Sequence, residues 1–309
     1  MSAPRHVEGT ESSAATDPVE EIGAEYRALT PEQELLLVAE INALRAQKPL
    51  VQCLTNTVVS QITANALLAA GAEPVMCDTP YESFDFARIA DGVLVNAGTP
   101  TDEQYSGMRQ AIAGAAEAQT PWVLDPVEAG GLAARTHFYR QAVHLAPTII
   151  RGNATEIAVL AKVRDGYEEV DSSQTLSVTV PAAKWLSEYG QAIVAASGLT
   201  DVVVSPAGTT LITGGHPLLN KVIGTGCFLG ALCAAYAGAA RKEGLDPHWA
   251  IVAAHAHTAA AGAKAGAQFP AQPGSFHVAW IDALYSLTPR EILDSVTIAH
   301  SDSGAQATT

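Results

Sequence analysis

Short apolar runs alternate along the chain with longer, Ala-rich amphipathic stretches. Runs of this length, bounded by Gly, Pro, Asn or Asp, are typical of buried strands. We expect strands at residues 50–54, 73–76, 92–96, 122–125, 148–151, 192–195, 201–205 and 209–213. We expect helices at residues 31–46, 58–70, 81–90, 102–118, 135–145, 155–162, 181–189, 226–242, 247–266 and 281–286. The alternation predicts an α/β fold of three layers, α/β/α, around a mostly parallel central sheet.

The two ends of the chain follow a different pattern. Residues 1–30 are polar and have neither a helical nor a strand period, so we expect a disordered extension. At its end, Thr30 and Pro31 form a helix start, with a hydroxyl cap followed by proline at the first helical position. We expect one domain over residues 31–300 and a frayed tail over residues 301–309.

Composition narrows the class of protein. Hydrophobic residues make up 48% of the 309 residues and charged residues only 16%, which suits a globular domain with a large core. The net charge of -15 argues against nucleic acid as a partner, because Lys and Arg bind phosphate backbones. We find no secretory leader and no apolar stretch long enough to span a membrane. The four cysteines lack zinc-ligand spacing, and we expect a cytoplasmic protein with reduced thiols.

The segment Gly224-Thr225-Gly226-Cys227 precedes a long apolar helix. Two glycines let the backbone aim its N–H groups at one point, and the helix adds the positive end of its dipole. Such a nest suits a phosphoryl group during transfer, although a Gly-rich helix entry without a ligand has the same pattern. Cys227 falls in the first helical turn, where the dipole should lower the pKa of a thiol. The alternative for Cys227 is a small buried residue.

A second set of polar residues follows two predicted strands. Asp125 ends one strand, and Arg151 and Glu156 flank the end of the next. The two carboxylates could hold Mg²⁺ through water, and the guanidinium could grip a phosphate oxygen. In the alternative interpretation, Glu156 belongs to a helix cap formed with Asn153 or Thr155, and Arg151 is a surface charge.

The longest informative segment covers residues 55–76, TNTVVSQITANALLAAGAEPVM. It reads as a strand end, a helix, a Gly cap and a second strand that ends at Met76. A methionine there could line a flat aromatic ring or could belong to the core. Further along, His255 and His257 lie two residues apart in an Ala-rich helix, and we interpret both as structural or exposed.

In combination, these segments resemble the hydroxyethylthiazole kinase family of the ribokinase-like superfamily. The resemblance runs from about residue 49 to residue 286, and the pieces keep the family's order: residues 55–76, then VLVNAGT, VLDPV, IIRGNATEI, VVVSPAGTTLITGGHPLLNKVIGTGC and PGSF. The pattern of residues 55–76 is specific to this family. GTGC and DPV are shared more loosely with related vitamin kinases.

The resemblance implies a homotrimeric kinase with active sites between its subunits. It implies Mg²⁺-dependent transfer of the ATP γ-phosphoryl group to the hydroxyethyl arm of 4-methyl-5-(2-hydroxyethyl)thiazole, a step of thiamine salvage. By motif position it also implies roles for individual residues: Met76, Asn56, Gly98 and Gly224 in the thiazole pocket; Arg151 and Ser197 on the ATP phosphates; Asp125 and Glu156 on the Mg²⁺ side; Gly224, Thr225 and Gly226 in the catalytic anion hole; and Cys227 where sugar kinases carry an aspartate base.

The chain departs from the family pattern at three positions. DPV is followed by Glu128, where the family usually has glycine, and this extra carboxylate could weaken ATP binding or add a metal ligand. Ser197 stands where the family mostly has threonine, which keeps the hydroxyl. Cys77 follows Met76 where a small residue is usual. The N-terminal extension is not part of the pattern.

Three other functions remain open. A kinase for hydroxymethylpyrimidine or pyridoxal would share the glycine nest but should lack the segment at residues 55–76. An ATP-dependent hydrate dehydratase of the same fold would place aspartate where this chain has Cys227. A non-catalytic nucleotide-binding relative is suggested only by Glu128.

Overall fold

The computed structural model describes residues 25–162 and 175–303, and its centre is one ten-stranded sheet. The strands follow the order β1-β10-β9-β8-β7-β6-β5-β4-β2-β3 across the sheet. Their bounds are β1 Arg27–Ala28, β2 Leu50–Leu54, β3 Glu73–Val75, β4 Gly92–Val95, β5 Trp122–Leu124, β6 Ile149–Asn153, β7 Ile193–Ser197, β8 Thr200–Ser205, β9 Gly208–Thr213 and β10 Thr297–Asp302.

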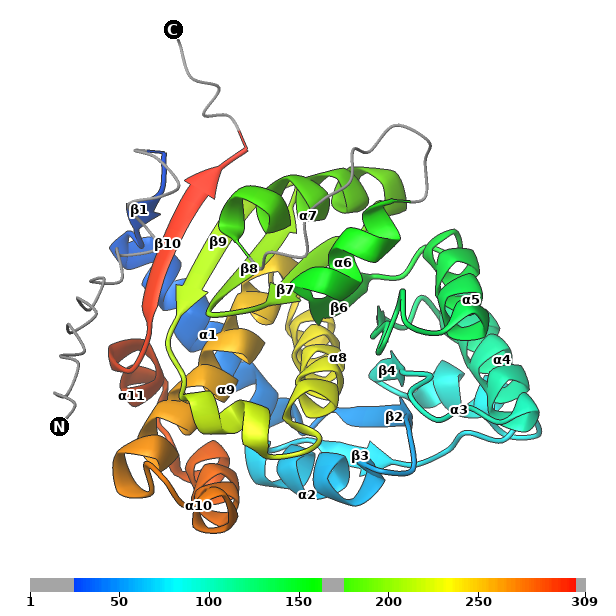
Figure 1. Cartoon of the computed structure of the whole chain (residues 1–309), viewed down its shortest axis with the longest axis horizontal. Coiled ribbons are helices and arrows are strands. Elements are labelled where there is room, and N and C mark those ends of the chain that lie inside the picture. The colour runs from blue at the N-terminus through cyan, green and yellow to red at the C-terminus, as the bar shows by residue number, and fades with distance from the viewer. Residues whose placement is uncertain (1–24, 163–174, 304–309) are drawn as a thin grey trace, which may run out of the picture.

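The strands from β3 to β7 pair in parallel, and β8, β9, β10 and β1 add an antiparallel edge (Figure 1). The predicted, mostly parallel sheet is therefore confirmed. Because the parallel strands share one direction, their carboxyl ends lie along the same side of the sheet. The residues that follow β2, β4, β5, β6 and β7 therefore meet at this carboxyl edge. Ligands of open α/β sheets bind at this edge.

Helices cover both faces of the sheet. One face carries α1 Pro31–Gln47, α2 Ser60–Ala70, α8 Thr225–Glu243, α9 Pro247–Gln268, α10 Pro273–Ser286 and α11 Pro289–Asp294. The other carries α3 Ser83–Ile89, α4 Asp102–Ala118, α5 Ala133–Val143, α6 Ala154–Ala161 and α7 Leu176–Gly190. A short 3-10 helix, η1 Pro217–Lys221, precedes α8.

Successive strand residues are buried on opposite faces of the sheet. In β4, Leu94 belongs to the core on the side of α8, while Val93 and Val95 belong to the core on the other face. All three side chains are fully buried. Continuous apolar runs, rather than alternating ones, are the expected pattern for strands buried on both faces. The three-layer α/β/α fold is confirmed.

The predicted start of α1 has the expected capping geometry. The Thr30 hydroxyl accepts a hydrogen bond from the Gln33 N–H, and the Gln33 side chain accepts one from the Thr30 N–H at 2.9 Å. This reciprocal capping box satisfies two donors that the first helical turn leaves free. Within the described ranges, no helix is both long enough and apolar enough to cross a lipid bilayer.

Both ends of the domain extend beyond the predicted boundaries. Strand β1 pairs with β10, and Tyr26 is buried, so the end of the expected extension belongs to the sheet. Strand β10 includes Ser301 and Asp302 of the expected frayed tail. A two-residue edge strand is too short to give a sequence period, which explains why it was missed. Residues 1–24 and 304–309 of these predictions lie outside the described residues.

Two predicted helix starts were too late by five residues or more. Helix α7 begins at Leu176, with Pro181 inside it, because the buried side chains of Leu176 and Val180 continue the helix toward its N-terminus. Helix α10 begins at Pro273, a proline at the first helical position. Helix α11 was not predicted, although Thr288 caps it in the same way that Thr30 caps α1.

Candidate active site

The polar residues that follow the parallel strands form a continuous hydrogen-bonded group. The Asn56 side-chain amide donates to Asn96 Oδ1 at 3.2 Å, and the Asn96 amide donates to Asp125 Oδ2 at 2.8 Å. Asn96 Oδ1 also accepts a hydrogen bond from the Gly98 N–H at 3.1 Å. The residues that end β2, β4 and β5 are therefore joined at one edge of the sheet.

Asn96 was not among the predicted site residues. It connects Asn56 to Asp125, and it is fully buried. Its signal was present in the sequence as a polar residue directly after the apolar run of β4. Gly98 has a steric role here, because a Cβ atom at this position would lie 2.7 Å from the Asn56 amide nitrogen.

Asp125 is fully buried at the centre of this group. Burial raises the pKa of its carboxyl group to about 7, and the charge of Glu156 adds to the rise. The Arg151 guanidinium and the hydrogen bond from Asn96 oppose the rise in the Asp125 pKa. Oδ1 has no hydrogen-bond partner among the described residues and lies 3.8 Å from Arg151 Nη1. Asp125 can therefore change its charge near neutral pH.

Arg151 joins β6 to the entry of α8 and to the end of β7. Its Nη1 donates to the Gly226 carbonyl at 2.9 Å, and its Nη2 donates to the Ser197 hydroxyl. The Nε–H is buried and has no partner in the described part of the chain. The interpretation of Arg151 as a surface charge is wrong, because only 6% of the residue is exposed. A buried guanidinium with a free donor is suited to binding an anion.

The backbone turns sharply at the entry of α8. Gly224 has φ +95°, and a Cβ atom there would lie 2.6 Å from Ile62 Cγ2. No side chain caps this helix end, so its first N–H groups are available to a ligand. The Thr225 hydroxyl donates instead to the Leu219 carbonyl at 2.9 Å, which fixes the turn.

The pKa of the Cys227 thiol differs from the sequence prediction. Burial raises the pKa of its thiol to about 11, and the Asp125 charge adds to the rise, while Asn96, Arg151 and Asn56 oppose it. A helix dipole contributes about 0.3–1 kcal/mol, less than one unit of the thiol pKa, and therefore cannot offset this burial. The expected lowering of the thiol pKa is wrong, and Cys227 is a neutral thiol at pH 7.

Glu156 forms the cap that was the alternative interpretation. Its Oε2 accepts a hydrogen bond from the Asn153 N–H at 2.8 Å, and its Oε1 accepts one from the Glu128 N–H at 2.9 Å. Both oxygens therefore already hold backbone donors. The described residues contain no cluster of three or more His, Cys, Asp or Glu side chains that could hold a metal ion.

Met76 lies at the edge of the group. It follows β3, next to β2, and is 38% exposed. No hydrogen bond or ion pair links it to the central residues, which is expected for a thioether. The structure thus brings together Asn56, Gly98, Asp125, Arg151, Ser197, Gly226 and Cys227, and leaves Met76 on the outer side.

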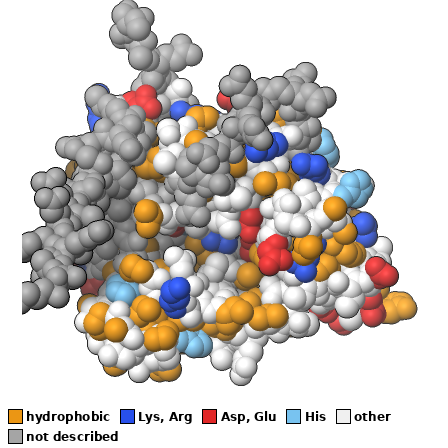
Figure 2. Space-filling view, viewed as in Figure 1, with side chains coloured by type: hydrophobic (Ala, Val, Ile, Leu, Met, Phe, Trp, Pro, Cys, Tyr) orange, Lys and Arg blue, Asp and Glu red, His pale blue; other side chains and the backbone are white. Residues whose placement is uncertain are grey.

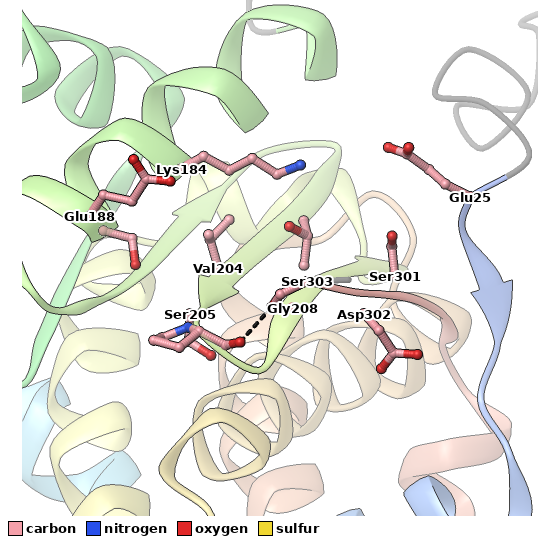
Figure 3. A pocket seen from close by; sticks show the side chains of 12 residues that line it. Glu25, Lys184, Glu188, Val204, Ser205, Gly208, Ser301, Asp302 and Ser303 are labelled. Carbon is pink, nitrogen blue, oxygen red and sulfur yellow. Dashed lines mark hydrogen bonds between the residues drawn. The ribbon is translucent and has the colours of Figure 1, made fainter. Parts of the chain in front are cut away.

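A cavity of about 140 Å³ opens beside this group. It is lined by Arg151 and Ser197, by Thr225 and Gly226 of the nest, and by Asp201 and His255. A larger hollow of about 430 Å³ lies at the antiparallel edge of the sheet, between Lys184 and Glu188 on one side and Ser301 on the other (Figure 3). The smaller cavity is the better candidate for the site, because the buried guanidinium and the free helix end both face it.

Comparisons with known proteins place the chain in a family. The sequence model of one protein family, described as "HK: Hydroxyethylthiazole kinase family", matches residues 41–290 of the chain. The chain belongs to the hydroxyethylthiazole kinase family. The matched range contains all residues of the hydrogen-bonded group and all the parallel strands.

Curated relatives of the family cover most of the chain. A hydroxyethylthiazole kinase of Corynebacterium efficiens is 54% identical over 249 residues, which cover 81% of this chain and 92% of that protein. One of Corynebacterium glutamicum is 50% identical and covers 84% of this chain and 96% of its own length. The solved structure of a hydroxyethylthiazole kinase protein from Pyrococcus horikoshii is 31% identical, with a TM-score of 0.78, and covers 87% of this chain and 100% of its own.

Glu128 stands where the hydroxyethylthiazole kinase pattern usually has glycine, and its backbone conformation is one that favours glycine. Its φ is +60°, in the left-handed region. Its carboxylate, 62% exposed, pairs with Arg135 of α5. The Arg135 guanidinium therefore pairs with the extra negative charge at the surface.

Proposed function

We propose that the chain phosphorylates the hydroxyethyl group of 4-methyl-5-(2-hydroxyethyl)thiazole with Mg-ATP in the cytoplasm, as part of thiamine salvage. The observation that carries the proposal is the position of Arg151, whose guanidinium is shared by Asp125, Ser197 and the Gly226 carbonyl. The Arg151 guanidinium thus links the ends of β5 and β7 to the entry of α8. Phosphoryl transfer depends mainly on such positioning and charge stabilisation.

In this proposal each residue has a separate task. Arg151 and Ser197 hold the ATP phosphates, and the N–H groups from Gly224 to Gly226 face the phosphoryl group that is transferred. Asp125, ionised above its pKa of about 7, accepts the proton of the substrate hydroxyl. Asn96 holds Asp125 through Oδ2, which leaves Oδ1 for the reaction. Cys227 packs against the substrate as a neutral thiol.

The thiazole binds in the same proposal between Asn56, Gly98, Gly224 and Met76. The partly exposed Met76 provides a polarisable, apolar surface for an aromatic ring. Mg²⁺ bound with ATP would neutralise phosphate charge on the side of Asp125 and Glu156. The fit rests on the two neighbouring carboxylates, whose charges lie close enough for Glu156 to raise the pKa of Asp125. The ion would reach them through water, which leaves Asp125 Oδ1 to accept the substrate proton.

A homotrimer completes the proposed site. Val58 and Ile223, each more than half exposed, line one hollow of about 350 Å³ beside the N-terminus of α10. Figure 2 shows further apolar side chains over α10 and α2 along the lower edge of this face. Exposed apolar surface next to a catalytic nest favours a subunit contact there. Light scattering after size exclusion should give about three times the 32.0 kDa chain mass, and a monomer would contradict the trimer.

One assay tests the activity. Purified protein is incubated with Mg-ATP and, in separate reactions, the thiazole alcohol, the pyrimidine alcohol, pyridoxal or nicotinamide hydrate. We expect a phosphorylated thiazole by mass spectrometry and little turnover of the others. Phosphorylation of the pyrimidine or pyridoxal without the thiazole would overturn the substrate, and ATP-dependent dehydration would overturn the reaction type.

A further inference from the structure

His255 of α9 lies in the wall of the cavity that contains Arg151 and Ser197. The residue is completely buried. Its Nδ1 is 2.7 Å from Asp201 Oδ2 of β8, whereas its Nε2 has no hydrogen-bond partner in the described part of the chain. A buried polar atom without a partner is uncommon and costs stability, so it calls for an explanation.

The other buried histidines behave differently. His257, two residues further along α9, contacts the Tyr236 hydroxyl through Nδ1 and the Leu284 carbonyl through Nε2. His248 and His300 also have partners at both ring nitrogens. Among the buried histidines that the structure describes, His255 alone combines a free ring nitrogen with a place in the cavity wall. Of the two sequence interpretations, structural or exposed, the exposed one is wrong.

Asp201 fixes the orientation of the His255 ring. Its Oδ1 accepts a hydrogen bond from the Gly198 N–H at 2.9 Å, and its Oδ2 faces His255 Nδ1. A carboxylate can only accept, so Nδ1 carries the hydrogen, and in this tautomer of the imidazole Nε2 is the acceptor. Gly198 follows Ser197, which binds Arg151, so the Asp201–His255 pair and the phosphate-binding group belong to one wall.

We propose that His255 is a nucleotide-binding residue, whose Nε2 accepts a hydrogen bond from the nucleoside half of ATP. Phosphate oxygens offer acceptors and negative charge, so they suit Arg151 and the helix end rather than a ring lone pair. The donors of ATP are its ribose hydroxyls and its exocyclic amino group. Asp201 is the positioning residue for this contact. The inference rests on the proposed use of ATP and extends it to how the nucleotide is recognised.

The test combines ligand and protein changes. Dissociation constants are measured by calorimetry for ATP, 2′-deoxy-ATP, 3′-deoxy-ATP and purine riboside triphosphate, which lacks the amino group. With the native chain, we expect one of the three analogues to bind roughly 2- to 12-fold more weakly than ATP, the usual range for one neutral hydrogen bond. His255→Asn keeps a donor for Asp201 but removes the Nε2 position, so this variant should bind ATP and that analogue equally.

His257→Asn is the matched control, since it changes a fully partnered histidine of the same helix. It should lower the melting temperature but preserve the discrimination between ATP and the analogue. If His255→Asn fails to fold, the ¹⁵N resonance of Nε2 in labelled native protein provides the test, and it should shift with ADP but not with the thiazole alcohol.

Two results would overturn the inference. One is a native chain that binds all four nucleotides equally, and the other is a His255→Asn variant that still discriminates. Neither result would affect the proposed kinase activity, which fails only if the native chain does not bind ATP or does not phosphorylate the thiazole.

Discussion

The side-chain amide nitrogen of Asn56 lies 3.5 Å from the Cys227 sulfur. These residues come from the end of β2 and the start of α8, far apart in the sequence, and Asn96 links the same amide to Asp125. The thiol is thus held among polar groups, yet burial raises its pKa to about 11. Asp125, with a pKa of about 7, is the stronger candidate for the catalytic base.

Cys227→Ala should therefore have a limited effect. We expect kcat to fall by less than about 10²-fold, the low end of what a general base contributes. Gly224→Val should cost more, because its Cβ would meet Ile62 at 2.6 Å and its φ of +95° disfavours a branched side chain. Single-turnover kinetics at saturating ATP compares the two variants. A slower Cys227→Ala enzyme would make the thiol the main catalytic group.

The rate should depend on pH through Asp125. If its carboxylate accepts the substrate proton, kcat should rise with pH to a plateau, with an inflection near the Asp125 pKa of about 7. Asp125→Asn should remove this inflection and lower kcat by about 10²–10⁴-fold. The measurement is a pH–rate profile of both proteins with saturating substrates. An unchanged inflection in the variant would assign it to another group.

The Mg²⁺ requirement should separate the two acidic residues. Asp125 has a free, buried oxygen, whereas both oxygens of Glu156 hold backbone N–H groups. Asp125→Asn should thus raise the Mg²⁺ concentration for half-maximal rate more than Glu156→Gln does. Glu156→Gln should instead lower the free energy of unfolding by about 1–3 kcal/mol, because the Gln amide cannot accept both hydrogen bonds. A larger Mg²⁺ effect from Glu156→Gln would reverse this assignment.

The two terminal nitrogens of the Arg151 guanidinium should be essential for ATP binding. Arg151→Lys keeps the charge but cannot reach both the Gly226 carbonyl and the Ser197 hydroxyl. We expect the KM for ATP to rise by roughly 10- to 150-fold, the value of one lost hydrogen bond to a charged group. Ser197→Thr, which keeps the hydroxyl, is the control and should change KM little. Steady-state kinetics that vary ATP and thiazole separately should show the effect on ATP only.

Much of the fold follows from local sequence signals. The strands from β2 to β9 give apolar runs bounded by turn residues, and Thr30 marks its helix start with a complete capping pattern. Edge elements give weaker signals. Strand β1 has two residues, and β10 finds its partners, β1 and β9, only when distant segments of the chain come together.

The sequence predicted which of these polar residues lie close together where strand position alone decides. Asp125 directly follows β5, Ser197 ends β7, and Arg151 lies in the middle of β6. Parallel strands bring such positions together. Protonation was not predictable from the sequence, because the pKa of Cys227 depends on burial by segments far along the chain. Two contacts were also not predictable, because they join distant segments. His255 of α9 faces Asp201 of β8, and Asn96 links Asn56 to Asp125.

A second buried polar network ties α9 to the antiparallel edge of the sheet. If His300 Nε2 donates to Asp302, its Nδ1 accepts from the Thr210 hydroxyl, at 2.8 Å. The Thr210 oxygen then accepts from His248 Nε2 at 2.8 Å, and His248 Nδ1 accepts from the Ser205 hydroxyl at 2.8 Å. One direction of hydrogen bonding satisfies the whole network with both rings neutral.

Acid should therefore destabilise the fold through His248. Burial, with His300 nearby, lowers its pKa from 6.5 to about 3, so below pH 6.5 the unfolded chain binds a proton that the folded chain does not. The stability from this group is complete above pH 6.5 and is lost as the pH falls toward 3, by up to about 1.4 kcal/mol per pH unit. Urea unfolding from pH 7 to pH 4 measures this slope. His248→Gln does not titrate at this position. The variant should be less stable at pH 7, but its unfolding free energy should fall less steeply with falling pH, by the uptake of one proton. Equal slopes in the two proteins would mean that His248 is protonated in the folded chain.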